Sequence, residues 1–172
     1  NELVRFSEDA AKMGVAFDTT AEQAGEWMAT WRTAFSMSQE EVVSLADQIN
    51  YLANTVNATA PQISEIVTKV GPLGKIAGLS SEEVAALGAA LVATGVQEDI
   101  AATGIKKLMT TMTAGSAVTT RQQNVLNKLG ISATDLAKRM QNDAQGAIID
   151  FFDAVNRLSP DEQTAALKDY FG

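Results

Sequence analysis

The feature that most constrains this chain is a helix-start signal that recurs along its length. In a capping box, Ser or Thr is followed three residues later by Glu or Gln, and the two side chains satisfy backbone amides that the first helical turn leaves without partners. The sequence carries this pattern at Thr20–Gln23, Ser38–Glu41, Thr59–Gln62, Ser80–Glu83, Thr120–Gln123 and Ser159–Glu162. Helix starts this close together leave room only for short helices.

Apolar residues between these starts recur three or four positions apart, as Trp27, Trp31 and Phe35 do, and this spacing places them on one face of a helix. No segment shows the sustained alternation of a half-buried strand. Glycines after the apolar runs predict helix C-caps at Gly14, Gly71, Gly95, Gly115 and Gly130. We predict helices over 2–13, 20–36, 39–57, 61–70, 81–94, 98–114, 120–129, 132–140, 144–158 and 160–171. The predicted fold class is all-α, a compact multi-helix bundle of about eight to ten short helices joined by Gly, Pro and Ser turns.

Composition limits the class of protein further. The 172 residues are 46% hydrophobic and 20% charged, which is typical of a globular domain and not of a disordered segment. The net charge of −8 disfavours binding to nucleic acid and to anionic lipid surfaces, because both carry negative charge. The longest stretch nearly without charge, Val84–Gln97, is shorter than the about 20 residues that cross a bilayer.

The length predicts one domain over residues 1–172. The alternative is a sub-division into a helical subdomain over 1–70 and a helical-hairpin core over 71–172. The sequence begins at Asn1, without Met and without a basic or cleavable leader, so we expect a fragment of a longer protein.

The residues predict no catalytic, cofactor-binding or metal-binding group. The chain has neither Cys nor His, so the usual thiolate nucleophile, general base and zinc ligands are missing. Residues 70–76 carry the glycines and lysine of a phosphate loop, but no strand precedes them and Ile76 stands where a hydroxyl would bind magnesium. Acidic pairs such as Glu82–Glu83 lie in first helical turns, where the helix dipole explains them. For Trp27 and Trp31 we favour core packing over a stacking platform for a ligand.

Residues 80–112 are rich in helix formers but contain Gly88, Gly95 and Gly104. Each glycine inside a helix costs roughly 0.5–1 kcal/mol relative to alanine. Gly88 lies on the apolar stripe of its helix and Gly104 precedes Ile105, so we expect both to allow close approach of a crossing helix. The helix-packing candidates are Gly88, Gly104, Leu87, Leu91, Ile105 and Leu108. The turn and cap candidates are Gly71, Pro72, Ser80, Glu83 and Gly95.

A series of small-residue motifs runs through residues 70–106. It comprises a Val-Gly-Pro turn, a Leu-Ser helix start, an Ala-Leu helix, a Gly-Val turn and a small-residue helix that leads into a lysine. These motifs occupy residues 70–72, 79–80, 85–93, 95–96 and 102–106. In this order they resemble the core region of bacteriophage tail tape measure proteins. The resemblance extends from about Ser38 to Gly172, with one departure, since members often carry an insert after the LGIS element where this chain continues directly into residues 134–137.

The resemblance implies a structural, non-enzymatic protein that fills the lumen of a phage or prophage tail tube, sets tail length during assembly and is released at infection. It implies as partners the tail tube protein, tail assembly chaperones, tail-tip or baseplate proteins and further copies of the same chain. The net charge predicts no nucleic-acid partner, and the residues predict no cofactor. The resemblance implies the virion tail as location, and the host bacterial cytoplasm during assembly. Two alternatives stay open. One is a membrane-active helical domain that aids genome delivery, and the other is a wall-degrading enzyme, which the missing His and Cys disfavour.

Overall fold

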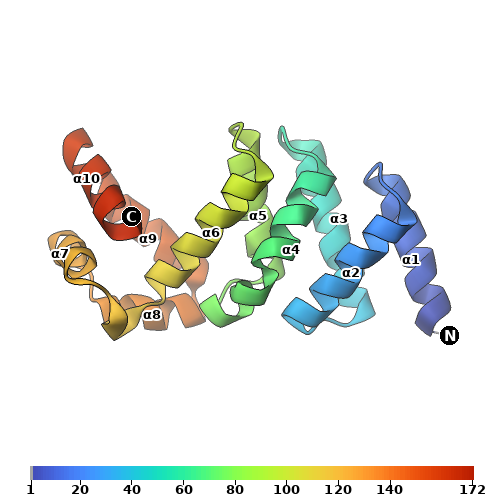
Figure 1. Cartoon of the computed structure of the whole chain (residues 1–172), viewed down its shortest axis with the longest axis horizontal. Coiled ribbons are helices and arrows are strands. Elements are labelled where there is room, and N and C mark those ends of the chain that lie inside the picture. The colour runs from blue at the N-terminus through green and yellow to red at the C-terminus, as the bar shows by residue number, and fades with distance from the viewer. Residues whose placement is uncertain (1) are drawn as a thin grey trace. The chain divides into compact units, whose positions relative to one another are not determined.

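The computed structural model describes residues 2–172, and all regular structure in that range is helical, as predicted (Figure 1). A single 3₁₀ turn, Gly115–Ala117, lies among ten α-helices. Their bounds are α1 Glu2–Ala16, α2 Ala21–Phe35, α3 Gln39–Thr55, α4 Ala60–Ala77, α5 Ser81–Ala93, α6 Glu98–Met112, α7 Thr120–Leu129, α8 Ala133–Asn142, α9 Ala144–Asn156 and α10 Pro160–Phe171. The predicted all-α class and number of short helices are therefore confirmed.

Capping boxes start several helices at the predicted residues. Ser38 before α3 and Ser80 before α5 each accept a hydrogen bond from the backbone amide three residues ahead. Glu41 and Glu83 in turn accept from the backbone amides of those serines, at 2.7 and 2.8 Å. Each reciprocal pair satisfies two amides of a first turn, which explains why these helices begin where they do.

Two predicted boundaries shift. The capping box before α7 is formed by Thr119 and Gln122, one residue earlier than the predicted Thr120 and Gln123, because Thr120 is itself the first helical residue. Gly14 does not end α1, which continues to Ala16. Its missing side chain serves packing, since a Cβ there would lie 3.0 Å from the Ala21 backbone nitrogen.

Gly95 ends α5 as predicted. Its backbone has φ +91°, in the left-handed region that favours glycine. The Gly95 amide donates to the Val92 carbonyl at 2.8 Å, and the Val96 amide donates to the Leu91 carbonyl at 3.3 Å. This pair of bonds is the Schellman arrangement, which satisfies carbonyls that the end of a helix leaves without partners.

The largest difference from the sequence prediction is the length of α4. The predicted turn at Gly71 and Pro72 does not form, and the helix continues through both residues to Ala77. Inside a helix, Gly71, Pro72 and Gly74 together cost about 5 kcal/mol relative to alanine. Tertiary contacts must therefore stabilise the last turns of α4, because local preference opposes them.

The described helices pack as two compact units. Unit 1 contains residues 2–75 and 80–105, and unit 2 contains residues 76–79 and 106–172. The chain thus passes into unit 2 after residue 75, returns to unit 1 after residue 79 and passes into unit 2 again after residue 105, within α6.

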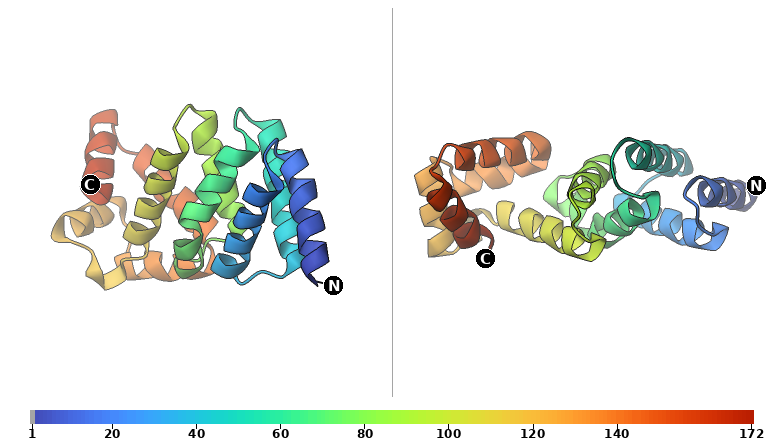
Figure 2. Two further views of the ribbon diagram at one scale, coloured as in Figure 1. Left: turned by 45° about the vertical axis from the view of Figure 1, so that its right-hand side comes forward. Right: turned by 90° about the horizontal axis from the view of Figure 1, so that it is seen from above.

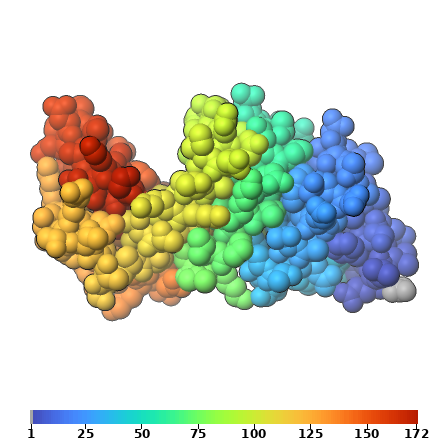
Figure 3. All heavy atoms as spheres, viewed as in Figure 1, coloured from blue at the N-terminus to red at the C-terminus, as the bar shows by residue number. Residues whose placement is uncertain are grey.

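Unit 1 consists of helical hairpins arranged in two layers. Helices α1, α3 and α5 form one layer, while α2, α4 and the first half of α6 form the other (Figure 2). Helix α3 packs against both α1 and α5 within its layer. In the second layer, the Lys69 ammonium of α4 pairs with the Asp99 carboxylate of α6. The near face of unit 1 is formed by α2, α4 and the start of α6 (Figure 3).

Two tryptophans join α2 to α4 in the core of unit 1, which confirms core packing over an exposed platform. Trp31 is fully buried, and its indole nitrogen donates to the Thr68 hydroxyl at 2.9 Å. Trp27 is buried as well, and its indole nitrogen donates to the Glu65 carboxylate at 3.0 Å. Each ring therefore adds buried apolar surface to the core, while its one polar atom, the indole nitrogen, has a hydrogen-bond partner.

On another face of α4, Ile66 packs directly against Gly88 of α5. A Cβ on Gly88 would lie 2.9 Å from Ile66 Cγ2 and 3.2 Å from its Cδ1, closer than packed carbon atoms approach. Gly88 thus occupies a close helix crossing, as its place on the apolar stripe predicts. The corresponding prediction for Gly104 is wrong. Gly104 is exposed, and no atom of a neighbouring element among residues 2–172 lies within 4 Å of its Cβ position.

Unit 2 is organised around an aromatic cluster where α9 meets α10. The rings of Phe151 and Tyr170 are 4.8 Å apart, and Phe152 and Phe171 pack around them. The Tyr170 hydroxyl lies 3.4 Å from the Thr111 carbonyl of α6, and burial raises the pKa of this phenol to about 12. The phenol therefore remains neutral in the core.

Gly88→Ala and Gly104→Ala should change stability in opposite directions. In the first variant, overpacking against the stiff Ile66 side chain costs about 1–3 kcal/mol and exceeds the helix preference gained by alanine. In the second, alanine meets open space and should stabilise by about 0.5–1 kcal/mol. Urea unfolding followed by circular dichroism measures both changes.

A double variant that carries Ile66→Ala as well as Gly88→Ala tests whether residues 66 and 88 are in contact. It should cost less than the sum of the two single changes, because the added methyl then occupies vacated space. Additive costs, or equal effects of alanine at 88 and 104, would contradict the close crossing.

Stability should depend on Glu162 at acid pH. Glu162 accepts from Lys128 Nζ at 2.8 Å and from the backbone amide of Ser159 at 3.1 Å, and these two bonds, the first being the larger cause, lower its pKa to about 2. A lowered folded-state pKa means stability that is present above the unfolded value of 4.5 and lost as pH falls toward about 2. Glu162→Gln should therefore flatten the decline in Tm over that range. Lys128→Met should flatten this decline too. If Tm falls with pH as steeply in both variants as in the wild type, the role of Glu162 is contradicted.

Candidate functional site

The sequence-predicted packing residues lie at more than one site. Gly88 is buried at the α4–α5 crossing, and Leu87 and Leu91 are half-buried on the same helix. Ile105 is 3% exposed, whereas Leu108 is half-buried one turn further along α6. These residues therefore form parts of the structural core and do not converge on a pocket.

The turn and cap candidates also divide. Ser80 and Glu83 form the cap of α5, and Gly95 ends it, as described above. Gly71 and Pro72 are helical instead. Gly71 is buried, and a Cβ there would lie 3.1 Å from both Ala34 Cβ and Phe35 Cε2. Its missing side chain lets α4 approach the end of α2, so it is a packing residue and not a turn residue.

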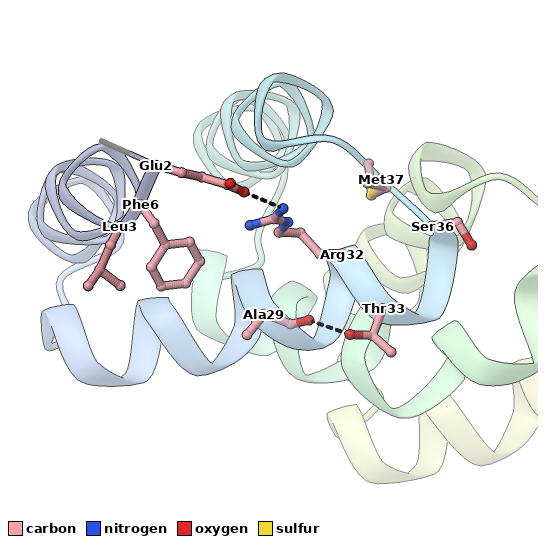
Figure 4. Close-up of a pocket in the computed structure, with 8 residues that line it drawn as sticks. All are labelled: Glu2, Leu3, Phe6, Ala29, Arg32, Thr33, Ser36 and Met37. Carbon is pink, nitrogen blue, oxygen red and sulfur yellow. Dashed lines mark hydrogen bonds and ion pairs between the residues drawn. The ribbon is translucent and has the colours of Figure 1, made fainter.

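Unit 1 has a groove between α1 and α2, which sequence analysis did not predict. It has a volume of about 830 Å³. Figure 4 shows eight residues that line it, from both helices and from the turn that follows α2: Glu2, Leu3, Phe6, Ala29, Arg32, Thr33, Ser36 and Met37. The Phe6 ring and the Met37 side chain are half-buried, so much of the lining is apolar.

An ion pair spans this groove. Arg32 of α2 donates to the Glu2 carboxylate of α1 at 3.0 Å (Figure 4). Nearby, Arg5 pairs with Glu40 at the start of α3. The Glu40 backbone amide, and then the Arg5 guanidinium, lower the pKa of the Glu40 carboxyl. Both carboxylates are more than half exposed, so each pair contributes little to stability and mainly fixes side-chain positions.

The chemistry of the groove suits contact with another protein surface better than a reaction. It offers apolar side chains, two hydroxyls and a neutralised ion pair, with no paired nucleophile and base. Across residues 2–172, no group of three or more Asp and Glu side chains converges as a metal site would. In the same range no helix is both long enough and apolar enough to cross a bilayer.

Comparison with known proteins gives consistent matches. The family model of the phage-related minor tail proteins matches residues 1–172. A probable tape measure protein of Halomonas phage phiHAP-1 is 36% identical over 170 residues, which is 99% of this chain and 20% of the relative. A probable tape measure protein of Escherichia phage P2 is 25% identical over 170 residues, which is 93% of this chain and 19% of the relative. No solved structure matches.

The present chain therefore spans about a fifth of the length of the curated relatives that it matches. The family match covers every residue, and the first relative agrees with it over almost the whole chain. The helical hairpins and close-packed glycines described above are thus the architecture of a member of the phage-related minor tail protein family, to which this chain belongs.

Proposed function

We propose that this chain is a folded part of a tape measure protein, located in the virion tail, where the complete protein fills the tail tube and sets its length during assembly. The observation that carries this proposal is the match to two relatives with that name over 93% or more of the chain. The all-helical architecture supports it, because helices convert residue number into length at a constant rise of about 1.5 Å per residue.

We infer a mechanical role and not a catalytic one. Several polar side chains of the described helices serve caps and ion pairs, as Ser80, Glu83 and Arg32 do. The proposal keeps the tail role ahead of the membrane-active alternative because the names of both relatives favour it.

The partners proposed for the complete protein are the tail tube protein, tail assembly chaperones, tail-tip or baseplate proteins and further copies of itself. The groove between α1 and α2 supports contact with protein, since its lining is largely apolar. The net charge of −8 supports the absence of DNA binding in a tube through which DNA later passes. During assembly the complete protein would be in the host cytoplasm.

Removing the segment from the complete protein should shorten the tail. An in-frame deletion of all 172 residues should reduce tail length by about 260 Å if the segment contributes as helix, and a tandem duplication should add a similar length. Electron microscopy of purified particles measures both. Gly104→Ala is the matched control and should leave tail length unchanged, because Gly104 is exposed.

Mass spectrometry of the same particles should detect peptides of this chain in the tail. Tails of unchanged length in both length variants would contradict the measuring role. Absence of the peptides from intact wild-type tails would contradict the proposed location.

A further inference from the structure

The end of α4 is a helix that its own sequence does not favour. We call residues 72–79 the α4 strap. Pro72 has no amide proton, so the Thr68 carbonyl lacks the helical hydrogen bond that any other residue would provide. Gly74 and Gly78 add backbone freedom within the next two turns. The helical form of the strap therefore depends on what holds it in place.

Within unit 1, contacts with the end of α2 hold the beginning of the strap. Gly71 comes directly before the strap and packs closely against Ala34 and Phe35. Lys75 Nζ donates to the Ser36 hydroxyl at 2.8 Å. Ser36 itself has the left-handed φ of +57°, so this contact connects two backbone segments with unfavourable local preference.

Within unit 2, α8 holds the end of the strap. Gln141 Nε2 donates to the Ile76 carbonyl at 2.7 Å, which satisfies one of the carbonyls at the end of α4. Gly78 has φ +80°, and a Cβ there would lie 2.0 Å from the Met140 carbonyl oxygen. Ala77 and Leu79 are each 3% exposed. This end is therefore closely packed on α8 and accepts only glycine at residue 78.

We propose that the α4 strap is a conformational device, helical while Gln141 and Met140 of α8 hold it and uncoiled when they release it. Uncoiling would lengthen the six helical residues of the strap, 72–77, from about 9 Å to about 20 Å while α4 before Pro72 stays helical. The break falls at Pro72 because the helix beyond it lacks local support. This inference does not rest on the tape measure proposal, since it concerns an equilibrium of the isolated chain.

Hydrogen–deuterium exchange of the purified chain tests the strap. In the wild type, amides of residues 73–77 should exchange at least about tenfold faster than those of residues 63–70, because they open without the rest of α4. In Gln141→Ala, exchange over residues 73–79 should rise by a further factor of about ten, with less than about a twofold change over residues 63–70. Gln163→Ala is the matched control, since it removes a 2.9 Å bond from a side-chain amide to the Leu158 carbonyl elsewhere in unit 2. It should leave residues 73–79 unchanged.

Pro72→Ala combined with Gln141→Ala should return exchange over residues 73–77 to within about twofold of the wild type, because alanine restores the missing amide and favours the helix. Equal exchange on both sides of Pro72 in the wild type would overturn the proposal, and this measurement needs no variant to fold. The proposal is also overturned if Gln141→Ala leaves amide exchange in the strap unchanged or raises it equally over all of α4. It is overturned as well if adding Pro72→Ala does not lower exchange again. These outcomes are independent of tail length, so this inference and the proposed function can fail separately.

Discussion

Helix α4 is the element on which the packing of unit 1 depends, because it is in contact with neighbours on more than one face. Two indole nitrogens of α2 donate to Glu65 and Thr68 on one side, and Ile66 fills the space left by Gly88 of α5 on another. A helix enclosed in this way can approach its neighbours closely only where side chains are absent. The glycine at residue 88 therefore sets the distance between α4 and α5.

The parts of the fold that local chemistry determines could be predicted from the sequence. Ser38, Ser80 and Gly95 act within their own turns, so their roles follow from neighbouring residues alone. Gly71 and Pro72 could not be assigned in this way. Their local preference is for a turn, and contacts with residues 34 and 35 overcome it. The same residue types thus end one helix and continue another, depending on partners distant in the sequence.

The candidate groove shows the same limit. Glu2 and Arg32 are thirty residues apart, and only the packing of α1 on α2 brings their side chains together. The helical hairpins of unit 1 could not be predicted as an internal sequence repeat either. They begin at Glu2, Gln39 and Ser81, which are not equally spaced along the sequence. Gly104 illustrates the opposite error. Gly88 lies on the apolar stripe of its helix and is buried, whereas Gly104 only precedes Ile105 of the next stripe and is exposed, so a glycine within a helix does not by itself predict a crossing partner.

Short helices also constrain how such a chain could exist in an extended form. Helices α7 and α8 have ten residues each, and isolated helices shorter than about 12–15 residues are marginal in water. Their stability depends on burying apolar faces, such as the one that carries Leu136 and Met140. If the complete protein is drawn out along a tube, those faces must be covered by another surface, either a tube subunit or a second copy.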